Sequence, residues 1–475
     1  MYHRLMGKPL EIPLDRSKKT SLAEQIRLAI SVAIDSGVLR PGARLPSWRD
    51  LAAQLGVARG TVKGAYELLL DAQLIESSRS RGTRVAARPA KAVTPAAPTD
   101  DSPLPSMYQD YVSAPAVFQM GVPSPDLYPA KLFSRLQISA ARAEASSPAV
   151  YPDPRGDLEL RREIAAYLAF SRGIECRASQ VLITNGFSGA LALIARVLRI
   201  EGRTGWVEDP GFPNTRRALQ FAGTRTVPVP VDEEGIDVAF AIQSTPDATF
   251  ALVTPGQQAP LGPTLSVERR VRLLEWAAAA EAWIIEDDYL GELQLSGRAA
   301  PALASIDRAG RVIYVGSFSK TIGPRLRLGF VVVPPMLLRE FGEAAVCYGP
   351  APGPIEQRAT AQFMREGHYL RHLRRTKRAY AAQRDALATI LQPMGYPIRA
   401  AGLAMLLELP KGARDTLIAR EGLALGIAPA PLSIWYCTPE SECSGLLLGI
   451  ATAREDQLGE SCARLHELID RYASN

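Results

Sequence analysis

The sequence has few cysteines and histidines, and it contains no long uncharged apolar run. Its 475 residues include 5 cysteines and 4 histidines. The cysteines lack the close pairing that is typical of zinc sites, and their odd number argues against a disulfide framework. No stretch is long enough to span a bilayer, and no apolar core of a secretion signal follows the first residues. We therefore expect a cytoplasmic protein without a membrane partner.

The histidines do not predict a metal site. His368 and His372 are four residues apart and would share one face of a helix, a spacing that can hold a metal ion. Arg371, Arg374 and Arg375 surround them, however, and would repel a cation. We therefore interpret both histidines as structural or solvated.

Positive charge is concentrated near the start of the chain. Residues 1–90 contain 15 Lys and Arg against 8 Asp and Glu, a net charge of +7, whereas the whole chain carries +6. Residues 91–475 are therefore close to neutral. This distribution is typical of a small module that meets nucleic-acid phosphates and is attached to a large neutral domain.

Two helices are predicted within residues 20–56. Leu22, Ile26 and Ile30 recur at the spacing of one helical face, behind a threonine and a serine that can cap the helix. A second helix is expected to begin after Ser47 as its N-cap and to stop at Gly56. A turn that contains proline and glycine separates the two.

A third helix is predicted over about residues 58–73, with an apolar stripe at Val62, Tyr66, Leu69 and Leu70. The stripe leaves basic and hydroxyl side chains exposed near the start of this helix. Two short helices joined by a glycine turn, the second beginning with such residues, are typical of a helix-turn-helix that enters the major groove of DNA. Residues 75–85 then predict a two-stranded wing whose tip brings arginines to the phosphate backbone.

Three motifs in this region resemble the GntR-type winged helix in their order. They are Leu45-Pro46-Ser47, Leu55-Gly56-Val57-Ala58-Arg59 and Arg81-Gly82-Thr83. The resemblance implies double-stranded DNA with paired half-sites as a partner. The expected DNA-contacting residues are Ser47, Arg49, Arg59, Thr61, Lys63, Arg79, Arg81 and Gly82. For any single arginine among them, an ordinary solvated helix face is the alternative interpretation.

A segment rich in proline and alanine separates two parts of the chain. Residues 87–114 include prolines at 89, 95, 98, 103 and 105 and show neither helical nor alternating periodicity. Such a composition predicts a semi-extended tether. We therefore divide the chain into a winged helix-turn-helix domain at 1–86, a linker at 87–114 and a large domain at 115–475.

In the large domain, three polar residues follow apolar, strand-like runs. Lys320 comes soon after the run 312–315, and Asp287 and Tyr289 follow the run 282–285. The carboxyl ends of strands form the ligand-binding edge of an open α/β sheet. There, a shielded lysine can attack an aldehyde, a carboxylate can pair with a pyridinium nitrogen, and a phenol can bond the ring oxygen. For each residue alone, a surface lysine or a solvated acidic turn is the alternative.

A phosphate group would need donors at the same edge. The run 181–184 leads through Asn185 and Gly186 into a helix, so the free N–H groups of the helix start point at the strand ends. Ser317 and Ser319 add hydroxyl donors, and Arg327 adds positive charge. Turns of this kind are common in α/β proteins. The prediction of a phosphate site therefore depends on the turn, the serines and the arginine occurring together in this order.

The order of the motifs resembles fold-type I aminotransferases and, more closely, their relatives among the MocR-type (GabR-like) bacterial transcription regulators. The motifs are Tyr151-Pro152-Asp153-Pro154-Arg155-Gly156, Thr184-Asn185-Gly186, Glu208-Asp209-Pro210-Gly211-Phe212, Thr254-Pro255-Gly256-Gln257-Gln258, Glu286-Asp287-Asp288-Tyr289 and Ser317-Phe318-Ser319-Lys320. With the winged helix, the resemblance covers nearly the whole chain. It implies an α/β fold whose mixed, mostly parallel sheet has helices on both faces.

The resemblance also implies a role for each candidate site residue. Lys320 would form the internal aldimine with pyridoxal 5'-phosphate, Asp287 would pair with the pyridinium nitrogen, and Tyr289 would bond the ring oxygen. Phe212 would lie against the ring, and Tyr151 would reach the phosphate from the neighbouring subunit of a homodimer. The other residues around the phosphate would be Gly186, Phe187, Ser188, Ser317, Ser319 and Arg327.

The ligand side of the site departs from the aminotransferase pattern. Many amino-acid aminotransferases bind the substrate carboxylate with an arginine in a late strand, but this strand reads Gly445-Leu446-Leu447-Leu448-Gly449. Gln257 and Ala259 stand where relatives often have histidine and an aromatic residue. An ordinary α-amino acid is therefore a doubtful ligand, unless Arg216, Arg217 or another arginine replaces the missing one.

Three functions remain open from the sequence. We favour a transcription regulator that binds pyridoxal phosphate and senses a small amine or amino-acid-like metabolite by imine exchange at Lys320, which shifts its DNA-binding domains. The first alternative is an active pyridoxal-phosphate-dependent aminotransferase with a fused DNA-binding domain. The second is a DNA-binding dimer that has lost the cofactor and keeps the large domain as a scaffold. Net catalysis in vivo is not expected, although residual transaminase activity is compatible with the resemblance.

Overall fold

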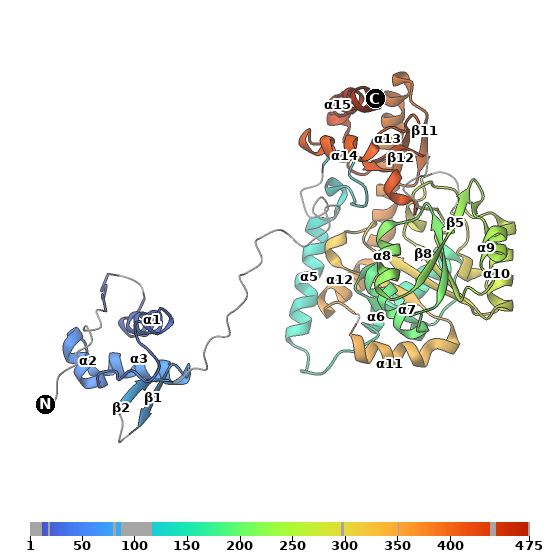
Figure 1. Cartoon of the computed structure of the whole chain (residues 1–475). Helices are drawn as coiled ribbons and strands as arrows, with labels where there is room; N and C mark the ends of the chain where they lie inside the picture. The colour runs from blue at the N-terminus through green and yellow to red at the C-terminus, as the bar shows by residue number, and fades with distance from the viewer. Residues whose placement is uncertain are drawn as a thin grey trace. The chain divides into compact units, whose positions relative to one another are not determined.

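The computed structural model divides into two compact units, Met1–Pro105 and Ser106–Asn475. We call them the head and the body (Figure 1). Residues 12–17, 20–78, 82–86, 116–295, 299–349, 351–437 and 443–473 are described. The predicted linker at 87–114 and the predicted wing-tip residues Arg79 and Arg81 lie outside these ranges, so their roles and the domain boundaries stay predictions.

The head consists of three helices and a two-stranded wing. Its elements are α1 (Leu22–Asp35), α2 (Trp48–Leu55), α3 (Arg59–Asp71) and the antiparallel strands β1 (Ile75–Ser78) and β2 (Gly82–Val85). The Ser47 hydroxyl caps α2 by accepting from the Asp50 N–H at 3.2 Å, and Gly56 ends the helix in the left-handed conformation. Ile26 and Ile30 of α1 are fully buried in the shared core. The winged helix-turn-helix prediction is confirmed.

One predicted core position of α3 is wrong. Leu70 was expected in the buried stripe, but it is 37% exposed, whereas Ala65 is fully buried. The buried residues of α3 are Val62, Ala65, Tyr66 and Leu69, which follow the three-and-four spacing of one helical face. Position 70 lies about 100° around the helix from position 69 and therefore turns away from α1.

The body is built on an eight-stranded sheet in the order β3-β10-β9-β8-β7-β4-β5-β6. The strands are β3 (Val181–Thr184), β4 (Thr204–Asp209), β5 (Arg225–Asp232), β6 (Gly235–Ile236), β7 (Phe250–Val253), β8 (Trp283–Asp288), β9 (Val312–Ser317) and β10 (Gly329–Val332). Only β10 and β6 run antiparallel to their neighbours. The strands β3, β9, β8, β7 and β4 therefore end at one edge, and the mixed, mostly parallel sheet is confirmed.

Helices cover both faces of this sheet (Figure 1). One face carries α7 (Gly186–Leu198), α8 (Pro213–Phe221) and α11 (Leu338–Tyr348). The other carries α5 (Ala130–Ala145), α6 (Leu158–Arg172), α9 (Val238–Ser244), α10 (Val267–Ala279) and α12 (Pro354–Arg365). Successive strand residues alternate between the two cores, so Ile285 of β8 packs on the α7 side and Ile284 on the α10 side. Because both faces are buried there, the strands β3, β7 and β10 are buried along their whole length and mostly apolar.

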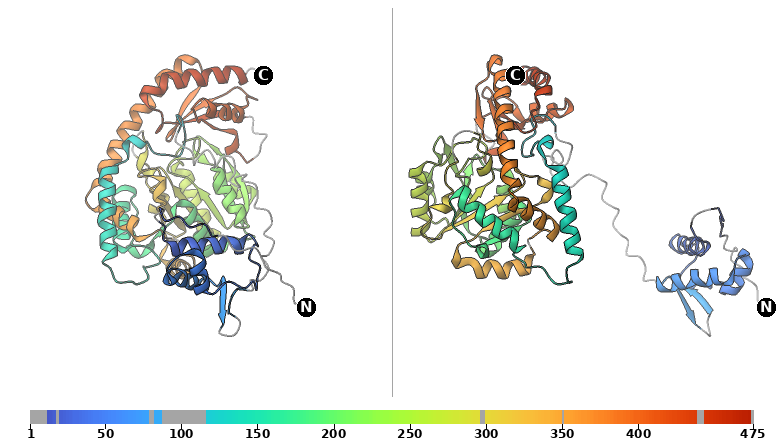
Figure 2. Two further views of the ribbon diagram at one scale, coloured as in Figure 1. Left: turned by 90° about the vertical axis from the view of Figure 1, so that its left-hand side faces the viewer. Right: turned by 180° about the vertical axis from the view of Figure 1, so that it is seen from behind.

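A smaller lobe completes the body. It contains the sheet β11-β12-β14-β13 and the helices α13, α14 and α15. The strands are β11 (Ile398–Ala401), β12 (Ala404–Glu408), β13 (Ala430–Pro431) and β14 (Gly445–Gly449), and the helices are α13 (His368–Leu391), α14 (Asp415–Ala424) and α15 (Glu455–Ala473). The long helix α13, orange-red in Figure 2, contacts α12 beside the large sheet and β12 of the small sheet.

Among the described helices, none is long and apolar enough to cross a membrane. The two histidines singled out from the sequence both have protein partners. His372 is buried and its Nε2 lies 2.6 Å from the Thr321 carbonyl oxygen, and the His368 Nε2 lies 3.0 Å from the Glu366 carboxylate.

Candidate functional site

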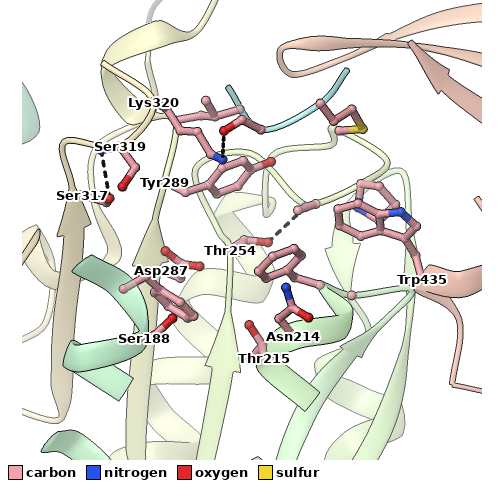
Figure 3. Close-up of a pocket in the computed structure, with 18 of the residues that line it drawn as sticks. Ser188, Asn214, Thr215, Thr254, Asp287, Tyr289, Ser317, Ser319, Lys320 and Trp435 are labelled. Carbon is pink, nitrogen blue, oxygen red and sulfur yellow. Dashed lines mark hydrogen bonds between the residues drawn. The ribbon is translucent and has the colours of Figure 1, made fainter. Parts of the chain in front are cut away.

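A cavity of about 350 Å³ opens at the shared strand edge of the body. Its walls come from the residues after β4, β7, β8 and β9, from the first turn of α7, from residues 119–122 and from the smaller lobe. Figure 3 draws Lys320, Asp287 and Tyr289 among the lining side chains. Residues that the sequence placed at separate strand ends are thus brought into one cavity.

The acidic triplet at the end of β8 has three different surroundings. Glu286 is buried, and its carboxylate accepts hydrogen bonds from the backbone N–H groups of Leu303 and Ala304, both at 2.8 Å. Asp288 lies on the same face of the strand and forms a buried ion pair with Arg172 at 2.6 Å. Asp287 points to the opposite face, because side chains alternate along a strand, and it alone of the three lines the cavity.

The Asp287 carboxylate faces the cavity. None of the residues that the structure describes donates a hydrogen bond to its carboxylate. Burial, together with the nearby Asp288 and Glu208 carboxylates, raises the pKa of Asp287 to about 8. Burial also raises the pKa of the Tyr289 hydroxyl, which is close to the same carboxylates. The base of the cavity therefore favours a cationic or hydrogen-donating group opposite Asp287.

The Lys320 ammonium reaches the cavity from the turn after β9. Its Nζ donates a hydrogen bond to the Gly121 carbonyl oxygen at 2.6 Å. Burial lowers the pKa of Lys320 to about 8, and the Asp287 carboxylate opposes that shift. A substantial fraction of this amine is therefore neutral slightly above neutral pH, which is the state that a nucleophilic amine requires.

The predicted phosphate-binding residues gather at one end of the cavity. Phe187 and Ser188 of the first turn of α7 line it, as do Ser317, Ser319 and Arg327. In the view of Figure 3, Ser188, Ser317 and Ser319 lie on the side opposite Trp435. The backbone N–H groups at the start of α7 and the serine hydroxyls provide donors for an anion there.

Gly186 supports this end without lining the cavity. It begins α7 with a φ of +70°, and a Cβ at this position would lie 3.6 Å from the Arg327 guanidinium carbon. The Arg327 Nη2 donates to the Asn185 carbonyl oxygen at 3.2 Å. The left-handed turn therefore favours glycine, whereas a Cβ would make only an ordinary van der Waals contact with the arginine.

Two other predicted residues have contrasting positions. Phe212 lines the cavity just before α8, and its ring centroid lies 5.7 Å from that of Trp435. Tyr151 is 100% exposed and does not line the cavity of its own chain. Its predicted contact is with the phosphate of a neighbouring subunit, so it stays a prediction.

Several lining residues were missed in the sequence. Thr254 directly follows β7, and its hydroxyl donates to the buried Glu208 carboxylate at 2.6 Å. Its position after an apolar run was a usable signal. Gly121 and Trp435 also line the cavity, but they come from segments without helical or alternating periodicity, so no local pattern identifies them.

Neither Arg216 nor Arg217 replaces the carboxylate-binding arginine that the late strand lacks. Arg216 lines the cavity, but its guanidinium donates to the backbone carbonyls of residues 434–436. Arg217 is exposed and does not line the cavity. Neither arginine presents a free guanidinium to a ligand carboxylate.

In the head, most predicted DNA-contacting residues are on the surface. Ser47, Arg49, Arg59 and Lys63 are exposed, and Thr61 and Gly82 are half-buried. The Arg49 guanidinium lies 4.8 Å from the centroid of the Trp48 ring. The Ser47 hydroxyl donates to the Asp50 carboxylate at 2.7 Å, so it is already engaged in capping α2. The DNA contacts themselves stay predictions.

Both units match known families. Residues 22–85 match the bacterial regulatory proteins of the gntR family, and residues 130–424 match aminotransferase class I and II. The probable rhizopine catabolism regulatory protein MocR of Rhizobium meliloti is 33% identical over 456 residues, which are 92% of each chain. The HTH-type pyridoxine biosynthesis transcriptional regulator PdxR of Corynebacterium glutamicum is 30% identical over 469 residues, 97% of this chain and 98% of that one.

The body also resembles solved aminotransferases. The crystal structure of LysN, an alpha-aminoadipate aminotransferase of Thermus thermophilus complexed with N-(5'-phosphopyridoxyl)-L-leucine, superposes with a TM-score of 0.70 at 25% identity. The superposition covers 78% of this chain and 95% of that one. The similarity to the regulators, in contrast, extends through head and body alike. The chain therefore belongs to the MocR family of HTH-type transcriptional regulators, in which a GntR-type DNA-binding head is fused to an aminotransferase class I and II body.

Proposed function

We propose that this regulator binds pyridoxal 5'-phosphate in the body and senses a small amine or amino-acid-like metabolite there, which changes DNA binding by the head. The observation that carries the proposal is the convergence of Lys320, Asp287 and Tyr289 in one cavity. When bound, the cofactor would supply an aldehyde carbon that amines attach to covalently, next to an electron-withdrawing ring.

The residues at the base of the cavity fit the ring of this cofactor. Asp287 lacks a donor among the described residues, and a pyridinium N–H would supply one and stabilise the charged carboxylate. The Tyr289 hydroxyl would donate to the ring oxygen, and Phe212 would pack against the ring face. The raised pKa of Tyr289 keeps its hydroxyl protonated, as a donor must be.

The donors at the other end of the cavity fit the phosphate. The phosphate oxygens would accept hydrogen bonds from the backbone N–H groups at the start of α7 and from the hydroxyls of Ser188, Ser317 and Ser319. The Arg327 guanidinium would balance part of the negative charge. Tyr151 would complete the set from a second subunit, since it is fully exposed in its own chain. We therefore propose a homodimer, whose two heads would reach paired half-sites on DNA through the linker at 87–114.

Residues 116–121 offer a route from the cavity toward the linker. The Gly121 carbonyl oxygen, which accepts a hydrogen bond from the Lys320 Nζ at 2.6 Å, would hold this amine whenever it is not attached to the cofactor. The same segment is fixed to the smaller lobe, because the Val117 carbonyl accepts from the Ala428 N–H and the Phe118 carbonyl from the Gly449 N–H, both at 2.7 Å. A change at Lys320 would thus act on backbone that continues into the predicted linker.

An active aminotransferase is the second candidate, because Lys320 and Asp287 would serve turnover as well as sensing. Repeated release of the oxo product from a candidate amine, in excess over protein, would favour the enzyme. A scaffold without cofactor is disfavoured, since the half-buried Asp287 carboxylate, which has no donor among the described residues, would then serve no partner.

A DNA-binding titration tests the proposal. The full chain, loaded with pyridoxal phosphate, would be titrated onto the intergenic DNA beside its own gene, with and without each member of a panel of small amines. We expect at least one amine to change the affinity of the loaded protein for DNA. We expect no such change in Lys320→Ala, whereas the exposed control Lys131→Ala should respond like the unchanged protein. An amine response that persists in Lys320→Ala would contradict the proposal.

A further inference from the structure

The cationic side chains around the cavity leave none for a ligand carboxylate. Among the lining residues that the structure describes, these side chains are Lys320, Arg327 and Arg216. The first two belong to the cofactor end under the proposed function. Whether a ligand carboxylate can be bound therefore depends on Arg216.

Arg216 is engaged by backbone. Its Nη1 donates to the Trp435 carbonyl oxygen, and its Nη2 donates to the Ile434 and Tyr436 carbonyl oxygens, both at 3.1 Å. Redirecting this guanidinium to a ligand would leave the Ile434 and Tyr436 carbonyls without this donor, which is costly in a partly buried site. Arg216 is therefore a positioning residue that fixes residues 434–436 beside the cavity.

Two further bonds fix the same loop to the large sheet. The Gly211 N–H donates to the Trp435 carbonyl oxygen at 3.0 Å, and the Cys437 N–H donates to the Asp209 carboxylate at 2.7 Å. Trp435 is consequently held at the cavity wall with only 7% of its surface exposed, and its ring packs on Phe212. A ring anchored in this way presents a fixed apolar surface to whatever lies beside the cofactor.

The wall around Trp435 is mainly apolar, and the same cavity lining contains two carboxyl groups. Met120, Ala259, Leu403 and Ala451 line the cavity with Trp435. Figure 3 shows Trp435 across the view from Ser317 and Ser319, away from the proposed phosphate end. The carboxyls of Glu208 and Asp287 form part of the same lining, so a ligand carboxylate would meet two acidic groups and, among the described lining residues, no cation that is not already engaged.

We propose that the ligand is a primary amine with an apolar body and no carboxylate, and that Trp435 selects it by packing on that body. This inference deepens the proposed function and rests on it. Apolar contact with the fixed ring would hold such an amine. A ligand carboxylate would be desolvated without a cationic partner among the described lining residues, so the amino acid that shares the same side chain would bind more weakly.

The test compares amines with the amino acids that carry the same side chain. The cofactor-loaded full chain is titrated by calorimetry with 3-methylbutylamine against L-leucine, and with 2-phenylethylamine against L-phenylalanine. Butylamine against 4-aminobutanoate places the carboxylate at the far end instead. We expect each amine to bind at least about tenfold more tightly than its carboxylate-bearing partner. Equal or tighter binding of the carboxylates would overturn the inference.

Variants at Trp435 test the selecting residue. Trp435→Ala should reduce the preference for 2-phenylethylamine over methylamine by about tenfold, and Trp435→Phe should keep most of it. Trp276→Phe is the matched control, because Trp276 is also 7% exposed but packs on Trp206 in a different core. If Trp435→Ala loses the cofactor, the comparison of Trp435→Phe with Trp435→Leu carries the test. An unchanged preference in Trp435→Ala, or in Trp435→Leu where Trp435→Ala loses the cofactor, would overturn the selecting role.

The result also separates this inference from the proposed function. Reduction with borohydride, followed by peptide mass spectrometry, reports whether the cofactor is attached to Lys320. An adduct at Lys320 together with a preference for carboxylates would overturn the inference and leave the proposed function standing. Absence of the adduct would overturn the proposed function itself.

Discussion

The head and the body hold their candidate functional groups in opposite environments. In the head, Arg49, Arg59 and Lys63 are exposed to solvent. In the body, burial moves the pKa values of Asp287 and Lys320 toward about 8 from opposite sides. An exposed charge acts through solvent and is screened by salt, whereas a buried charge depends on its few neighbours and on its own protonation. The head should therefore respond to ionic strength and the body to pH.

Salt should have the largest effect, and only on the head. Raising the salt concentration from about 50 to about 200 mM should weaken binding to operator DNA by about a thousandfold, as expected for about six phosphate contacts. Cofactor affinity should change by less than about threefold, since its contacts are buried. Fluorescence anisotropy with labelled DNA and equilibrium dialysis of the cofactor measure the two responses. A DNA affinity that is flat across the salt series would contradict the assignment of the basic head.

The adjacent residues Asp287 and Asp288 should separate cofactor binding from stability. Asp287→Ala should weaken pyridoxal phosphate binding by about a hundredfold, because the ring nitrogen would lose its buried partner. Asp288→Ala leaves the buried Arg172 guanidinium without its carboxylate and should instead lower the free energy of unfolding by about 3 kcal/mol. Equilibrium dialysis and denaturant unfolding measure these effects. Equal losses of cofactor affinity in both variants would mean that strand alternation does not separate the two roles.

The rate of cofactor attachment should rise with pH and then level off. Because the pKa of Lys320 is lowered to about 8, its amine is mostly protonated at pH 6.5 and mostly neutral at pH 8.5. Attachment to the cofactor-free protein should therefore be about twentyfold faster at the higher pH and should plateau above it. Stopped-flow absorbance measures the rate. A rate that keeps rising about tenfold per pH unit beyond pH 9 would indicate an ordinary solvated lysine.

Tyr151 tests whether the body requires a second subunit. Tyr151→Phe should weaken cofactor binding by about tenfold, which is the loss of one hydrogen bond to a charged group. Tyr348→Phe is the control, since Tyr348 is also exposed, at 60%, and does not line the cavity. A fully exposed side chain that affects a buried site must act on another copy of the chain. If Tyr151→Phe binds the cofactor normally, the predicted contact between subunits is wrong.

Gly64 should give the smallest effect. A Cβ at this position in α3 would meet nothing within 4 Å, so Gly64→Ala should stabilise the helix by about 1 kcal/mol. Hydrogen exchange of the α3 amides in the full chain measures the gain. DNA affinity should stay unchanged in the same variant. A loss of affinity would indicate that the DNA backbone approaches α3 closely at Gly64.

Sequence reasoning succeeded where a local pattern fixes the position of a residue. Lys320 and Asp287 follow apolar runs, and parallel strands bring their carboxyl ends to one edge. Helical spacing of apolar residues, together with the Ser47 and Gly56 caps, predicted the helices of the head. Leu70 shows the limit of this approach. The adjacent Leu69 and Leu70 both fit an apolar stripe, and only the packing of α1 on α3 shows that Ala65, and not Leu70, is buried with Leu69.

The ligand side of the cavity could not be read in the same way. Trp435 lies in a short turn of the smaller lobe, and its position depends on Arg216, more than two hundred residues earlier in the chain. Gly121 reaches Lys320 from an irregular segment at the start of the body. Bonds between segments so distant in sequence leave no periodicity. The sequence therefore showed that the late strand lacks an arginine for a ligand carboxylate, but not that Arg216 is bound to the backbone of residues 434–436.

Reduction of the cofactor-treated full chain with borohydride, followed by peptide mass spectrometry, tests the central claim most directly. The account predicts the mass of the reduced pyridoxal phosphate adduct on the peptide that contains Lys320 and its absence in Lys320→Ala. No adduct at Lys320 with saturating cofactor, or an adduct only on other lysines, would contradict it.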